Sequence, residues 1–198
     1  MKSPRKTIGL LAVIITLIIS ACATGSGPRW LWEVQWVDRQ EGTYGNWTTS
    51  HNSNEFDVWT RSRVLGSKGG QFSNQSYIHV QSSQGEDAFV GINIGDGFIC
   101  GDEILVKMAW EDSQGGKKIE TTYLSTSTNN ELLLFSYKRA EKYRFLHMLN
   151  LYDKLAIQTV DKCGENTIVR FNIEGTHHMT TTETNPEGHS YTIKSKVS

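Results

Sequence analysis

The sequence predicts a mainly β fold, a single antiparallel β-sandwich-like domain with one short helix, after a cleaved signal peptide. The first observation is an alternating segment, in which one side of the chain presents Trp30, Trp32, Val34 and Trp36. A period of two residues is typical of a half-buried strand. The second is that similar short segments recur, separated by clusters of Gly, Asn, Asp and Ser. Many short strands joined by such turn residues favour a sandwich or a barrel.

Eight further strands are expected along the chain, at residues 56–60, 76–81, 88–94, 103–110, 119–124, 132–135, 155–160 and 167–173. Residues 140–152 differ from these, because their apolar side chains recur at steps of three and four: Phe145, Leu146, Met148, Leu149 and Tyr152. That spacing is one face of a helix, which we expect to cap one end of the sheets. Residues 191–197 alternate again and form either an edge strand or a frayed end.

The N-terminus has the three parts of a secretory signal peptide. Lys2, Arg5 and Lys6 make a basic start, residues 8–19 form an apolar run, and small residues lead to Cys22. The run is shorter than the roughly 20 apolar residues that cross a bilayer. Residues 19–22 read Ile-Ser-Ala-Cys and resemble the bacterial lipobox.

That resemblance implies a bacterial lipoprotein, cut before Cys22 and carrying fatty acids such as palmitate on this residue. Several acyl chains hold a protein stably on a membrane. Ala23 stands where an Asp would favour the inner membrane, so the resemblance implies the outer membrane, facing the periplasm. The expected organisation is a signal peptide at 1–21, a lipidated flexible tether at 22–29, a β domain at 30–176 and a polar tail at 177–198.

The net charge limits the classes of partner that we expect, and the cysteine content predicts a disulfide. Three of the 20 basic residues and none of the 21 acidic ones precede Cys22, so the mature chain has a net charge of −4. Nucleic acid is therefore not an expected partner. With Cys22 lipidated, Cys100 and Cys163 are left, and an oxidising periplasm favours a disulfide between them. A shared metal or two buried free thiols are the alternatives.

A second resemblance covers less than half of the mature chain, from Phe89 to Gly175. It consists of residues 97–100 (Gly-Phe-Ile-Cys), residues 104–108 (Ile-Leu-Val-Lys-Met), a short helix leading into residues 155–159, and residues 171–175 (Phe-Asn-Ile-Glu-Gly). This pattern resembles β-sandwich modules of uncharacterised exported bacterial proteins, including the invasion-associated locus B type. The resemblance implies a fold and no catalytic residue.

No motif points to catalysis, a metal or a cofactor. His177 and His178 with Glu183 and His189 could bind zinc or copper, but neighbouring side chains on a strand point to opposite faces. We therefore interpret them as surface histidines of the polar tail. Carboxylates lie near Gly-rich turns at Asp96, Asp102, Glu103 and Asp112 without the spacing of a calcium loop, so we interpret them as turn residues. No GxSxG elbow occurs.

Tryptophans are frequent in the N-terminal half. Trp32, Trp36 and Trp110 are expected in the core, whereas Trp47 lies in a loop-like Gly- and Thr-rich stretch. Exposed aromatic residues in loops are typical recognition anchors. Trp47 and Trp59 are therefore the candidate partner contacts.

We expect a non-enzymatic binding lipoprotein whose partner is another envelope or secretion-related protein. One alternative is an outer-membrane structural or exclusion lipoprotein that protects against phage, plasmid or toxin. An envelope hydrolase is the remaining alternative, which the missing catalytic constellation disfavours.

Overall fold

The computed structural model describes residues 31–36, 40–53, 57–68, 71–83, 88–95, 99–135, 139–160, 163–164, 166–184, 187 and 190–192. The proposed signal peptide, Cys22 and the tether lie outside these residues. The chain separates into two compact units, residues 32–183 with 191–198, and residues 1–31 with 184–190. The first unit contains the features discussed below.

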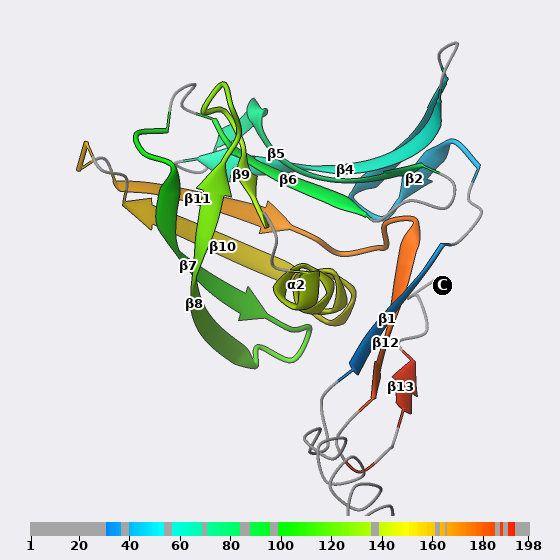
Figure 1. The fold of residues 1–198 in the computed structure, drawn as a ribbon. Helices are drawn as coiled ribbons and strands as arrows, with labels where there is room; N and C mark the ends of the chain where they lie inside the picture. The colour runs from blue at the N-terminus through cyan, green and yellow to red at the C-terminus, as the bar shows by residue number, and fades with distance from the viewer. Residues whose placement is uncertain are drawn as a thin grey trace, which may run out of the picture. The chain divides into compact units, whose positions relative to one another are not determined.

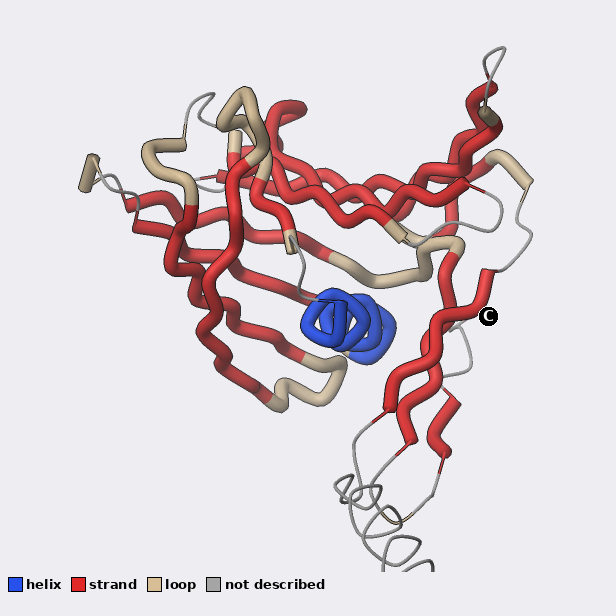
Figure 2. Tube along the Cα trace, in the orientation of Figure 1, coloured by secondary structure: helices blue, strands red, loops and turns tan. Residues whose placement is uncertain are grey.

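The strands of the described part cover most of its length. Their bounds are β1 Leu31–Trp36, β2 Gly42–Tyr44, β3 Trp47–Ser53, β4 Val58–Lys68, β5 Gln71–Ser83, β6 Phe89–Ile94, β7 Glu103–Glu111, β8 Lys117–Thr126, β9 Leu133–Leu134, β10 Lys154–Val160, β11 Asn166–Asn172, β12 Met179–Thr184 and β13 Ser190–Thr192. The helix α2 spans Arg139–Leu151. Figure 2 shows this helix against the strands.

The main sheet has the strand order β11-β10-β7-β8-β9-β6-β5-β4-β3-β2. In addition, Gly66–Lys68 of β4 pair with Val169–Phe171 of β11. This pairing joins the two ends of an eight-strand run and gives a barrel-like ring (Figure 1). A smaller sheet has the order β1-β12-β13. Within the described residues, the prediction of a mainly β chain with one short helix is confirmed, whereas a sandwich is not, because the main sheet closes on itself.

Gly66 allows this closure. A Cβ atom at this position would lie 2.6 Å from Cε1 of Phe171 and 2.7 Å from Cγ1 of Val169. The β4–β5 register also shifts between Leu65 and Gly66. Bulges of this kind bend a strand and increase its twist. The bend and the missing side chain together bring β11 against the end of β4.

Alternating side chains of the ring fill its interior. In β7, Ile104, Val106, Met108 and Trp110 are buried, and the residues between them face outward. The helix lies inside the curve of the sheet (Figure 1). Its Phe145 packs edge-on against Trp110 at 5.4 Å and against Phe135 at 4.8 Å between ring centroids. The predicted helix at 140–152 is thus confirmed within one residue at each end, and its apolar face belongs to the core.

Candidate functional site

The outer side of β4, β5 and β6 gathers arginine and aromatic side chains. Strand alternation produces this, because Ser62, Val64, Ile78, Val80 and Val90 point inward and are buried. We call the outward group the arginine–aromatic face, which consists of Trp59, Arg61, Arg63, Tyr77, His79, Gln81 and Phe89. The register pairs Arg61 with Gln81 and Gln81 with Phe89 across three neighbouring strands.

Arg63 and Arg61 are both held by neighbours on β5. The guanidinium of Arg63 lies over the ring of Tyr77, 3.9 Å from its centroid. Such a contact favours the cation and fixes its plane. The Nε and Nη2 atoms of Arg61 donate to Oε1 of Gln81 at 2.9 and 2.5 Å. Two guanidinium groups are therefore positioned two residues apart on one strand.

His79 lies between the half-buried ring of Tyr77 and the exposed ring of Phe89. Its imidazole stacks on Tyr77 at 5.6 Å and packs against Phe89 at 5.2 Å between centroids. Gly91 is opposite, where a Cβ atom would lie 2.6 Å from Nε2 of His79. Burial, followed by the charges of Arg61 and Arg63, lowers the pKa of His79 to about 4. The imidazole is therefore neutral at pH 7, and both charges that act on it are positive.

A groove of about 440 Å³ adjoins the face. Its lining residues are Asn46, Thr48, Arg63, Leu65 and Asn172. It forms where β4 changes partner, because β3 pairs with β4 as far as Val64 and β11 pairs from Gly66 onward. Amide and guanidinium groups beside an apolar side chain can hold a carboxylate and its attached carbon chain.

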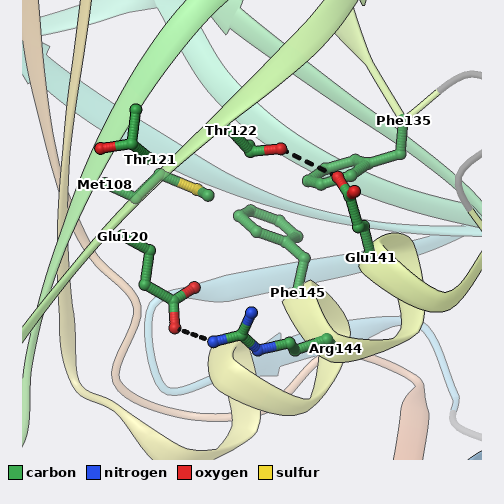
Figure 3. Close-up of a pocket in the computed structure, with 8 residues that line it drawn as sticks. All are labelled: Met108, Glu120, Thr121, Thr122, Phe135, Glu141, Arg144 and Phe145. Carbon is green, nitrogen blue, oxygen red and sulfur yellow. Dashed lines mark hydrogen bonds and ion pairs between the residues drawn. The ribbon is translucent and has the colours of Figure 1, made fainter.

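A smaller pocket of about 140 Å³ lies between α2 and β8 (Figure 3). Met108, Phe135 and Phe145 form its apolar part. Arg144 forms an ion pair with Glu120, which also binds Lys118 at 3.1 Å. Thr122 donates to Glu141 at 2.8 Å. These contacts tie the helix to β8, so the charged groups of this pocket already serve the fold.

The structure confirms some of the predicted site residues and contradicts others. Cys100 and Cys163 form the expected disulfide, with Cα atoms 5.7 Å apart. Trp59 is partly buried and lies on the arginine–aromatic face. The interpretation of Trp47 as an exposed contact is wrong, because its side chain is fully buried and its indole Nε1 donates to the Ile173 carbonyl at 3.1 Å. Trp110 is buried as expected, and the side chains of Trp32 and Trp36 lie outside the described part.

The interpretation of the two adjacent histidines as surface residues is also wrong. His177 and His178 are fully buried rather than exposed in a polar tail. His178 contacts Ser62 Oγ at 2.7 Å through Nδ1 and Ser82 Oγ at 2.8 Å through Nε2. A serine beside an imidazole can act as a nucleophile, but Ser62 is itself fully buried and no substrate reaches it. The compact unit therefore extends past residue 176, and these contacts attach its last part to β4 and β5.

A second histidine links the helix to β12. His147 contacts Thr181 Oγ1 at 3.0 Å through Nδ1 and Glu183 at 3.1 Å through Nε2. Burial lowers the pKa of His147, and the Glu183 carboxylate opposes this shift. Asn150 adds a hydrogen bond to the Met179 carbonyl at 3.2 Å. The polar side of α2 thus holds β12 in place.

Within the described residues, no three His, Cys, Asp or Glu side chains gather as metal ligands. Asp112 accepts the amide hydrogens of Gln114 and Gly116 at 2.9 and 2.7 Å, as expected of a turn carboxylate. Asp96 and His189 lie outside the described part. No described helix has the length and apolar character needed to cross a membrane.

Sequence reasoning identified Trp59 but missed Arg61, Arg63, Tyr77 and Phe89. The signal was present as the alternation Trp59-Thr-Arg-Ser-Arg63, which places three long side chains on one side of a strand. Comparison with known proteins finds no matching family model, curated protein or solved structure.

Proposed function

We propose that this chain is a lipid-anchored, non-enzymatic binding module of the bacterial envelope that holds another envelope or secretion-related protein. The observation that carries this proposal is the arginine–aromatic face. Arg63 is stacked on Tyr77, and Phe89 beside them is 41% exposed. Arginine and aromatic residues are enriched at protein interfaces and dominate their binding energy.

The partner presents an acidic segment in this proposal. Arg61 and Arg63 both act on His79 as positive charges, and Arg63 also lines the groove beside Leu65. A carboxylate of the partner pairs with the guanidinium of Arg63, and its side-chain carbons pack on Leu65. Because Tyr77 and Gln81 already orient the two arginines, binding orders few additional side chains.

The chemistry of the face supports binding rather than catalysis. An arginine keeps its proton in proteins, so it cannot act as a general base. The pKa of His79 near 4 makes this imidazole a poor acid and a weak base at pH 7. The groups of the face can recognise an anion, but they do not move its protons.

The proposal is tested by photo-crosslinking in cells, with a crosslinking amino acid in place of Phe89. We expect one dominant adduct, which Arg63→Ala reduces by about 30-fold, the effect of losing an interface hot spot of about 2 kcal/mol. Arg139→Ala is the matched control, because Arg139 also lies over a tyrosine, at 5.1 Å from the ring centroid of Tyr143 on α2. Thermal melting of both variants establishes that they are folded.

Equal adduct yields from the Arg63 and Arg139 variants would refute this face as the partner site. A folded Arg63→Ala chain that keeps its full adduct yield would also refute this face as the partner site. A chain that forms no adduct yet changes phage or plasmid uptake on deletion would favour the exclusion role instead.

A further inference from the structure

The other half of the ring carries an unusual share of exposed apolar side chains. Of the nine large apolar residues that are exposed in the described part, five lie on the outer side of β8, β7, β10 and β11. They are 37–63% exposed: Leu105, Ile119, Tyr123, Val160 and Ile168. Leu105 is paired directly with Tyr123 on one side and with Val160 on the other. The three side chains form a row across three strands.

Cations surround these apolar residues. Lys107, Lys117, Lys154 and Arg170 are exposed on the same four strands. Two carboxylates share this side, Glu103 and Glu111, and Glu111 binds Lys154 at 2.7 Å and Lys117 at 3.5 Å. Four positive and two negative charges leave this side net positive, although the whole chain has a net charge of −1. We call this side the lysine–apolar face.

A groove of about 380 Å³ lies within the lysine–apolar face. Ala109 and Ala156 are paired in register and form its floor, because their small side chains leave space. Lys117, Lys154 and Arg170 stand around it, together with Glu111, whose carboxylate pairs with both lysines. Three cations against one carboxylate leave the groove net positive, and a phosphate with its several acceptor oxygens fits such a site.

We propose that the lysine–apolar face docks on an anionic bilayer surface, with a lipid phosphate in the groove among Lys117, Lys154 and Arg170. Ile119, Tyr123 and the row around Leu105 then lie at the level of the headgroups. This position suits Tyr, which is enriched at membrane interfaces. Lysine stems also cover apolar surface while their charged ends stay in water.

A lipid surface matches this face better than a protein does. Three of its four cations are lysines, and lysine is depleted at protein–protein interfaces. Each basic side chain near an anionic membrane adds about fivefold to binding, and the contribution falls off within a Debye length. The scattered lysines therefore act together on a charged surface without a matched set of partner carboxylates.

Docking in this way turns the β5 and β6 part of the arginine–aromatic face away from the membrane, whereas β4 neighbours β11 of the lysine–apolar face. In the eight-strand ring, β5 lies four positions from β7, and β6 lies four positions from β10. Strands half a ring apart lie on opposite sides of the ring. Tyr77, His79 and Phe89 of the proposed partner site are then open to the periplasm.

The test uses the full chain, held in vesicles by its own N-terminal segment. An environment-sensitive dye is attached to an added cysteine at Ile119→Cys, and the chain without this cysteine is the blank. Val58→Cys on β4 is the matched control, because Val58 is 62% exposed and Ile119 is 63% exposed. Vesicles of phosphatidylcholine alone are compared with equimolar phosphatidylcholine and phosphatidylglycerol, each containing a spin-labelled lipid that quenches the dye.

We expect quenching and a blue shift at position 119 on the anionic vesicles only, and neither at position 58. Lys107→Gln, Lys117→Gln and Arg170→Gln combined should lower the ratio of docked to undocked chains by about 100-fold. Lys142→Gln and Arg139→Gln on α2 remove the same kinds of charge elsewhere and should leave that ratio unchanged. High salt should move the dye at position 119 out of the anionic bilayer in the chain that keeps its native lysines and Arg170, which tests the charge dependence without removing a charge.

Equal quenching at positions 119 and 58 would overturn the proposal. So would quenching that resists both high salt and the triple substitution. If position 119 is shielded only when envelope proteins are added, the face binds a protein and lipid docking is wrong.

Discussion

Trp47 and Trp110 are both buried, but only the indole of Trp47 has a hydrogen-bond partner within the described part of the chain. Trp47 donates to the buried Ile173 carbonyl at 3.1 Å, whereas Nε1 of Trp110 has none. Replacing each by Phe removes a similar volume from the core. Trp47→Phe additionally removes a donor from a buried carbonyl, which costs about 1–3 kcal/mol. Trp110→Phe removes a donor that makes no bond.

The two variants are therefore expected to differ. With the intact disulfide, Trp47→Phe should unfold at a temperature about 4–8 °C below that of Trp110→Phe, given a difference of about 2 kcal/mol in a chain of this size. Thermal unfolding followed by circular dichroism measures this, and urea unfolding gives the free energy directly. Equal melting temperatures would show that the hydrogen bond to Ile173 contributes nothing. A fully stable Trp47→Phe chain with weakened partner binding would restore Trp47 as a surface contact.

Four further results are expected. Replacing Cys100 and Cys163 together by Ser should lower the free energy of unfolding in urea by about 4 kcal/mol, because the bridge closes a loop of 63 positions, and reductant should do the same to the parent chain only. Because the pKa of His79 falls to about 4 in the folded state, the unfolded chain binds the proton more readily. Stability should then be complete above about pH 6.5 and fall by about 3 kcal/mol as the pH drops towards 4, and His79→Gln should flatten this part of the profile. Gly66→Ala should cost about 1–3 kcal/mol of unfolding free energy, because its Cβ would overlap Phe171, and an unchanged urea midpoint would contradict the closure described above. Cys22→Ser should abolish palmitate incorporation while leaving the circular dichroism of the β domain intact, and continued labelling would refute the lipobox interpretation.

Local patterns in the sequence predicted the elements better than their pairing. The alternation of β7 and the helical spacing around Phe145 are contained in short segments, so both were found close to their observed bounds. The ring was not predictable in the same way. It depends on β11 reaching Gly66 of β4, and neither segment shows on its own that the other will approach.

The errors at Trp47 and His178 have a common cause. Polar residues flank each of them, so each segment resembles a loop or a tail. His178 is buried because Ser62 and Ser82 meet its two ring nitrogens, and both serines lie more than 90 positions away, at separations of 116 and 96. Trp47 is satisfied in the same way by Ile173, 126 positions away. Hydrogen-bond partners that lie so far away in the sequence leave no local pattern from which burial could be predicted.

Closure of the ring also sets an order of events in folding, because the two strands that close it are far apart in the sequence. The chain is synthesised N-terminus first, so β4 emerges about 100 residues before the strand that completes its pairing, a separation that slows folding. Until β11 arrives, residues 66–68 of β4 are an uncovered strand edge, which can pair with other chains. The last ring strand to be delivered is therefore the one that protects the molecule from aggregation. Chains truncated before residue 166 should depend on chaperones to stay unaggregated, whereas chains that include β11 should close without them.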